Sequence, residues 1–169
     1  METSIPAAVI AAILMVSAVV LGRSGYQAFD GMGQVWKEME ARAGDQARTQ
    51  LTITSVTHSP PNSPYVNVNL RNDGSTNLAN YDRMDVVVQY TTGTGARVLV
   101  WVPYTSSPLT DNTWTVQGIL GDAFEPGIVN PTETLQMRIQ LNPIVGNGTT
   151  NRLLIATDLG VTVSTTFTG

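Results

Sequence analysis

The chain changes its pattern of apolar residues near residue 50. From Ile5 to Leu21 no residue is charged and most are apolar. Through 22–47, apolar residues recur at steps of three or four, which is typical of an amphipathic helix. Beyond Gln50 the period becomes two, which is typical of strands. We therefore expect a hydrophobic and amphipathic N-terminal helix over 1–49 and a separate β domain over 50–169.

Small residues in the apolar segment are spaced for close packing between helices. They form pairs four positions apart, which lie on one side of a helix and let backbones approach: Ala7/Ala11, Ala8/Ala12 and Ala18/Gly22. Four later glycines each weaken the helix by about 1 kcal/mol relative to alanine, so neighbouring helices must support it. At 1.5 Å per residue, a helix from Ile5 to Thr49 is about 67 Å long, more than twice the bilayer core.

Three interpretations of the apolar segment compete. A cleaved secretory signal is disfavoured, because no basic residue precedes the apolar run and no Ala-x-Ala site closes it. A simple signal anchor is possible, with Arg23 as its nearby basic residue. The third interpretation is a filament-core helix that crosses the membrane before assembly and is buried in a bundle afterwards. The small residues and the length favour the third.

The β domain contains eight β-rich runs separated by Gly, Pro and Asn turns. They cover residues 51–56, 65–71, 84–90, 97–104, 113–119, 134–141, 152–157 and 161–167. The spacing predicts an immunoglobulin-like antiparallel sandwich, so the whole chain is expected to be α+β. Val98–Val102, with Trp101, is the most continuously apolar run and is expected to be a central strand.

Composition excludes several classes of function. The chain has no cysteine, so neither disulfides nor a thiolate metal site is available. Its net charge is −4, and the β domain carries five basic against eight acidic residues. Such an acidic surface with scattered arginines is not a nucleic-acid footprint.

No catalytic, cofactor or metal site is expected. His58 is the only histidine and lies in a predicted loop, without a Gly-x-Ser-x-Gly elbow elsewhere. Five oxygen-bearing residues could in principle hold Ca²⁺ but match no EF-hand spacing: Asn72, Asp73, Asn80, Asp82 and Asp85. Turns recruit such residues for backbone reasons alone. Asn147-Gly148-Thr149 is the one Asn-x-Ser/Thr sequon and makes Asn147 a glycosylation candidate.

Four short stretches, in this order behind an apolar N-terminal helix, resemble the archaellin family, the major subunits of the archaeal swimming filament (archaellum). They read VNVNLRNDGST at 66–76, MDVVV at 84–88, EPGIVNPTE at 125–133 and GVTVS at 160–164. The stator-type subunits of the archaellum share this layout. Ile5 stands where type IV pilins have an acidic residue, and no basic leader precedes Met1.

The resemblance implies a structural protein rather than an enzyme. It would polymerise into a surface filament for swimming, with helices in the core and β domains as the sheath. Six residues are expected to pack in that core: Ile13, Val16, Ala18, Val20, Gly22 and Phe29. The implied partners are copies of itself, minor filament subunits, the motor with its membrane platform, and the membrane before assembly. The alternatives are a membrane-anchored, envelope-binding stator-like component and a pilin-like adhesion filament subunit.

Overall fold

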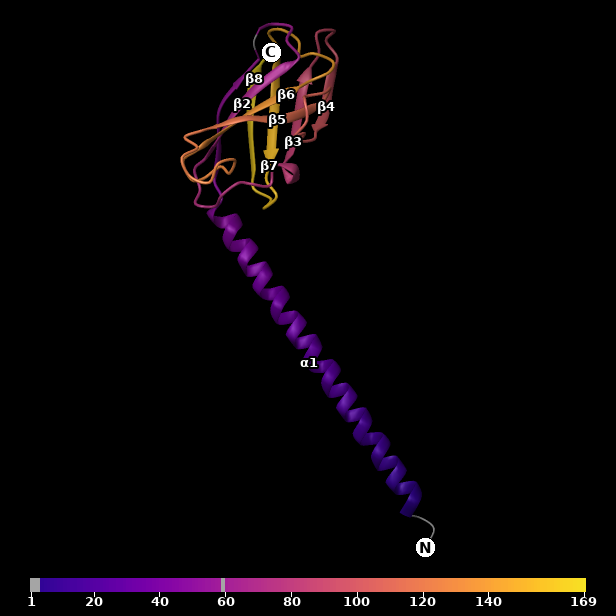
Figure 1. Ribbon diagram of the computed structural model, residues 1–169. Helices are drawn as coiled ribbons and strands as arrows, with labels where there is room; N and C mark the ends of the chain where they lie inside the picture. Colours follow the sequence, from indigo (N-terminus) through magenta and orange to yellow (C-terminus); the bar gives the residue numbers. More distant parts are fainter. Residues whose placement is uncertain (1–3, 59) are drawn as a thin grey trace. The chain divides into compact units, whose positions relative to one another are not determined.

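The computed structural model describes residues 4–58 and 60–169, with side chains at all of these positions except 4–8, 24, 25 and 27–31 (Figure 1). Within this range the chain forms the helix α1, a short 3-10 helix at Tyr81–Arg83 and eight strands. Contacts divide it into two compact units, Met1–Ala43 and Gly44–Gly169. The functional division expected at residue 50 stays a prediction.

Helix α1 spans Ser4–Arg48. Pro6 falls in its first turns, where a missing N–H costs little, and no other proline precedes Pro60. Beyond its last residue, the hydroxyl of Thr49 donates a hydrogen bond to the carbonyl of Asp45 at 2.8 Å. This bond occupies one of the carbonyls that a helix end leaves without a partner. The last turn, from Gly44, belongs to the second unit.

The expected fold class, α+β, is wrong. The chain is mainly β, because eight antiparallel strands in two sheets supply its packed structure. None of the buried apolar residues among the described positions comes from α1. The uncharged, apolar character of the helix is confined to its first half. The described core of the chain therefore comes from the strands and loops of the second unit alone.

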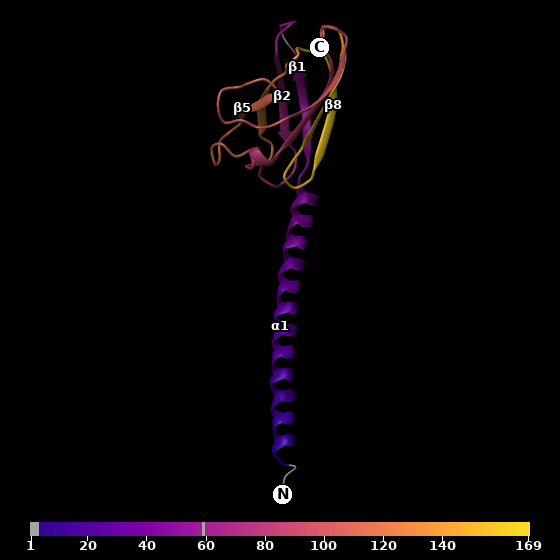
Figure 2. The ribbon, with the colours of Figure 1, turned by 90° about the vertical axis from the view of Figure 1, so that its right-hand side faces the viewer.

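The strands form two four-stranded sheets, here named after their central strands (Figures 1 and 2). The β2/β6 sheet has the order β1-β2-β6-β5, with β1 at Leu51–Thr57, β2 at Tyr65–Asn72, β5 at Thr113–Leu120 and β6 at Thr134–Gln140. The β3/β7 sheet has the order β4-β3-β7-β8, with β3 at Asp85–Thr91, β4 at Arg97–Val102, β7 at Thr150–Ala156 and β8 at Thr162–Thr168. Strands β1 and β8 contact each other along one side (Figure 2).

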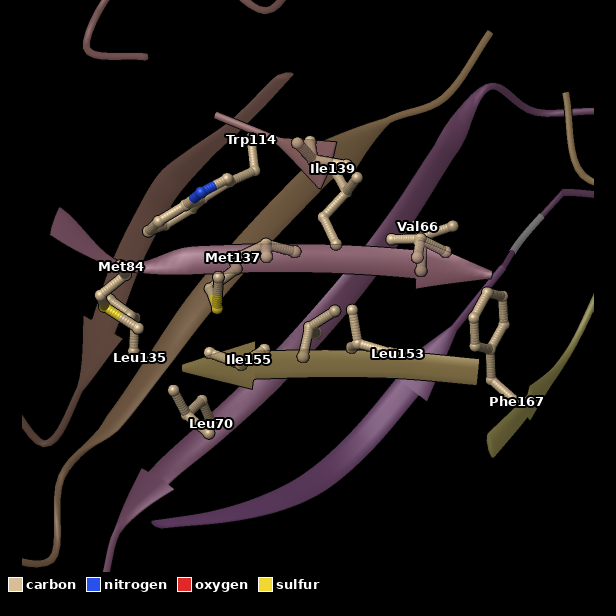
Figure 3. Packing of buried hydrophobic residues seen from close by; sticks show 14 of the residues in the cluster. Val66, Leu70, Met84, Trp114, Leu135, Met137, Ile139, Leu153, Ile155 and Phe167 are labelled. Carbon is tan, nitrogen blue, oxygen red and sulfur yellow. The ribbon is translucent and has the colours of Figure 1, made fainter. Parts of the chain in front are cut away.

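The core lies between the two sheets and follows the two-residue period of the strands. Alternate residues of the central strands are buried, among them Val66 and Leu70 of β2 and Leu153 and Ile155 of β7 (Figure 3). The fully buried Trp114 closes one end of this cluster. Burying apolar area is the main stabilising term in folding, at about 25 cal/mol per Å². The second unit therefore contains its own core.

Strand β4 is at the edge of its sheet, and the expectation of a central position was wrong. Its Val98, Val100 and Val102 face the core, whereas Leu99 and Trp101 remain 70% and 57% exposed on the other side. A continuous apolar run usually indicates a strand covered on both faces. In this chain the outward face of the run has no cover from described residues.

Candidate functional site

Five of the six residues expected to pack in a filament core lie on the exposed surface of α1. Ile13, Val16 and Val20 are 59%, 64% and 56% exposed. Ala18 is exposed, and no atom lies within 4 Å of where a Cβ on Gly22 would be. The side chain of Phe29 lies outside the described residues. Packing by these six residues thus stays a prediction that requires other molecules.

The first half of α1 is apolar around its described circumference. Its large side chains from Val9 to Leu21 are each more than half exposed. The one hydroxyl among them, on Ser17, donates to the carbonyl of Ile13 at 2.8 Å, which satisfies it within the helix. A helix that is apolar all round is stable only when lipid or protein covers it. Among the residues with described side chains, no helical stretch is both long and apolar enough to cross a membrane.

A second feature is a polar network that joins the last turn of α1 to two loops of the second unit. The N–H groups of Asp73 and Ser75 donate to the carbonyls of Gln50 and Arg48 at 2.8 and 2.9 Å. A Cβ on Gly74 would overlap the backbone at Arg48 and Gln50, so only glycine fits this close approach. The turn at residues 72–75 therefore packs directly against the backbone at the end of α1.

Buried Asn72 connects the turn at 72–75 to the loop at 129–133. Its side-chain amide donates to the carbonyls of Thr76 and Val129 at 2.7 and 3.2 Å. Its backbone accepts from Thr132 at 2.8 Å and donates to the carbonyl of Glu133 at 3.0 Å. Two of the motifs that carry the archaellin resemblance, separated by some fifty residues, are thus brought together. We call the set of residues 48–50, 72–76 and 129–133 the junction network.

Glu133 completes the junction network from the β6 side. It is a buried carboxylate that accepts from the backbone N–H of Asn130 at 2.8 Å. Nearby, the hydroxyl of Tyr81 donates to the carbonyl of Gly127 at 2.8 Å. Burial, helped by the charges of Tyr104, Asp122 and Glu133, raises the pKa of Tyr81 to about 12. Sequence reasoning gave these residues no function, although the spacing Asn130-Pro131-Thr132-Glu133 is a turn signal.

The oxygen-bearing residues considered for Ca²⁺ are spread over separate contacts. Asp73 pairs with Arg71 at 2.6 Å; its pKa is lowered by hydrogen bonds from Thr52 and Arg71. Asp85 accepts from Trp101, and Asn80 donates to Asp158 at 2.7 Å. Within the described positions, no group of three or more His, Asp or Glu side chains could hold a metal ion.

The two remaining candidate residues lie in loops. His58 follows β1, and its Nε2 donates to the carbonyl of Ser63 at 2.8 Å. Asn147 is exposed between β6 and β7, and the hydroxyl of Thr149 in the same sequon donates to the carbonyl of Gly146 at 2.5 Å. An exposed sequon in a turn is accessible to a glycosylating enzyme. Glycan attachment at Asn147 stays a prediction.

No family model and no curated protein matches this sequence. Three solved structures of archaellum components resemble it. The archaellum periplasmic stator protein FlaG from Sulfolobus acidocaldarius is 24% identical, with a TM-score of 0.53 over 70% of this chain and 99% of that chain. The archaellum periplasmic stator protein complex of FlaF and FlaG from the same organism is 25% identical, with a TM-score of 0.53 over 70% of this chain and 89% of that chain. The archaeal flagellum of Methanospirillum hungatei strain JF1 is 15% identical, with a TM-score of 0.58 over 98% of this chain and 93% of that chain.

These similarities relate the chain to archaellum components at the level of fold. They include both stator and filament proteins, so they do not single out the major filament subunit. The similar proteins are structural parts of a cell-surface machine rather than enzymes.

Proposed function

We propose that this chain is a stator-type component of the archaellum, held at the cell envelope. The observation that carries the proposal is the similarity to the FlaF and FlaG complex, at 25% identity over 89% of that chain. The filament structure is only 15% identical. A sequence and fold likeness that covers nearly all of a stator domain favours that class over the filament class.

The two units suit a protein that holds its position under load. The apolar surface of α1 is the part that lipid or other envelope components would cover. The segment Ile5–Leu21 carries no charge and is near the lower limit of about 17 residues for a membrane helix. Force on the helix would enter the second unit through Gly44 and reach the junction network. Its hydrogen bonds would then spread that force over three segments of backbone.

The test is the location of the chain in cells that make archaella. Filaments are sheared from the cells and purified, and the chain is quantified by mass spectrometry in the filaments and in the remaining envelopes. A stator-type component should remain with the envelopes and be nearly absent from the sheared filaments. If the chain is the major component of those filaments, the proposal is wrong.

A filament subunit is the second candidate, favoured by one observation. The similarity to the archaeal flagellum covers 98% of this chain, so it includes α1, whereas the stator similarity covers 70%. In a filament, copies of the chain would cover Ile13, Val16 and Val20, and Gly22→Leu would overpack the contact at a cost of about 1–3 kcal/mol per subunit. Under this function Gly22→Leu abolishes filaments, whereas Glu38→Gln preserves them, because exposed ion pairs contribute about 0–1 kcal/mol.

A further inference from the structure

The outward face of the β3/β7 sheet carries an exposed apolar patch, which we call the β4 patch: Val87, Leu99, Trp101 and Leu154. Leu99 and Trp101 are mostly exposed, and the other two side chains are half-buried. The outward face of an antiparallel sheet is ordinarily polar. The β2/β6 sheet follows that rule, since β2 and β6 turn Asn67, Asn69, Gln136 and Arg138 outward. The β4 patch therefore requires an explanation other than core packing.

Strand register orders the patch into rows. Trp101, Val87 and Leu154 are direct cross-strand neighbours and form one row across three strands. Leu99, Gln89 and Arg152 form the next row. A shallow hollow of about 220 Å³ lies within the patch, lined by Val87, Gln89, Leu99, Arg152 and Leu154.

Trp101 stands beside this hollow as an oriented side chain. Its Nε1–H donates to the carboxylate of Asp85 at 2.9 Å, which limits rotation of the ring. Large aromatic side chains held in advance lose little entropy on binding and are enriched among residues that dominate interfaces. The patch thus presents a projecting side chain, Trp101, next to a hollow.

Charges at the two ends of the patch have opposite sign. Asp85 lies at the start of β3, and Arg97 lies opposite Thr91 at the other end of that strand. Arg152 lies on the same basic half, in the row of Gln89. A two-fold axis in the plane of the face, crossing the strands between the Trp101 row and the Leu99 row, brings the acidic end of one copy over the basic end of the other. The distribution is self-complementary, as an isologous interface requires.

We propose that the β4 patch is the docking surface for a second copy of this chain, arranged about such a two-fold axis. The Trp101 row of each copy faces the Leu99 row of the other, and each Asp85 meets the region of Arg97. Opposite charges placed on either side of these two rows favour a second copy, because the same face then complements itself. The inference goes beyond the proposed function, because it concerns a face of the second unit and no envelope contact.

Thiol cross-linking of the full chain tests the interface, since the natural sequence has no cysteine. Thr166→Cys places one exposed thiol on β8, at the border of the same face, and a short bifunctional maleimide then reports paired faces. The chain should give cross-linked dimer in detergent solution. Adding Leu99→Asp should lower the yield about tenfold, because it buries a charge at the centre of the interface. Adding Gln117→Asp, exposed on the other sheet, should leave the yield unchanged.

A charge exchange keeps the test independent of folding defects. Asp85→Arg and Arg97→Asp, each added to the Thr166→Cys chain, should each lower cross-linking with itself. A mixture of the two chains, distinguished by tags, should recover cross-linked heterodimer, because both contacts then join Arg to Asp. The proposal is overturned if the chain that carries only Thr166→Cys gives no cross-linked dimer. It is also overturned if Leu99→Asp leaves the yield unchanged, or if the mixture gives no heterodimer.

Discussion

Apolar side chains have opposite surroundings in the two units of this chain. In the second unit, Leu70, Val86 and Leu135 are fully buried by the two sheets. In α1, Leu14, Leu21 and their neighbours are more than half exposed. The β sheets therefore obtain their stability from within the chain, whereas the apolar half of the helix depends on molecules outside it. That difference supports the proposal that α1 attaches the chain and that the β unit is presented.

The largest expected effect separates a buried from an exposed apolar side chain. Trp114 is fully buried and lies against Tyr104, with ring centroids 4.9 Å apart. Trp114→Ala should lower the free energy of unfolding of the β unit by about 3–5 kcal/mol. Leu21→Ala, at a side chain that is 72% exposed, should change it by less than about 0.5 kcal/mol. Urea unfolding followed by far-UV circular dichroism of both variants checks this, and equal losses would remove the contrast.

A second comparison tests the junction network against an open loop. Gly74→Ala should destabilise the β unit by about 1–3 kcal/mol, because the new Cβ overlaps the backbone at Arg48 and Gln50. Gly93→Ala is the matched control, since no atom lies within 4 Å of where a Cβ on Gly93 would be. That control should be neutral or raise stability by up to about 1 kcal/mol. The measurement is the urea midpoint; a Gly74→Ala chain as stable as the control contradicts the close approach.

The pH dependence of the β unit offers a smaller effect. The folded state raises the pKa of Tyr81 from 10.0 to about 12, mainly by burial, and burial also raises that of Tyr90. At Tyr81 the folded state thus keeps a proton that the unfolded state releases between about pH 10 and pH 12. The free energy of unfolding should be constant below that window with respect to these groups and fall within it.

Tyr81→Phe isolates the contribution of one of these tyrosines. Its unfolding free energy should decline less steeply between about pH 10 and pH 12 than that of the native chain. Thermal unfolding at a series of pH values measures both slopes. Equal slopes would mean that Tyr81 is not held neutral by its surroundings.

The smallest expected effect follows removal of the first unit. A fragment of residues 44–169 keeps every buried apolar residue of the described core and the backbone of Arg48 and Gln50. Its circular dichroism should be mainly β, with a cooperative melt at nearly the temperature of the full chain. An unfolded or largely helical fragment would show that the β unit needs α1.

Local pattern predicted the strands of this chain but not their neighbours. Each of the eight expected runs overlaps an observed strand, because alternation and turn residues act within a few positions. The edge position of β4 was missed, because apolar residues on both sides of Leu99 and Trp101 resemble a doubly covered strand. The class was wrong for a related reason, since the pattern of α1 does not say how much of the packed core a helix supplies, and α1 supplies none of the described core.

The junction network lay beyond the reach of local pattern. Asn72 and Glu133 are ordinary turn residues in sequence, and their contact depends on how β2 pairs with β6. Gly74 could have been suspected from its turn motif, but the backbone that it approaches could not. Resemblance to a known family was informative about the machine and less so about the part, since stator and filament subunits share these motifs.

The most direct test of the stator assignment is where single labelled copies lie on swimming cells. Gln117→Cys provides one exposed thiol on β5 in a chain otherwise without cysteine, and a thiol-reactive dye can label it. The account predicts fluorescent spots at the cell envelope, at the base of each archaellum, with none along the filament. Fluorescence that extends along the whole filament would contradict it and identify the chain as a filament subunit.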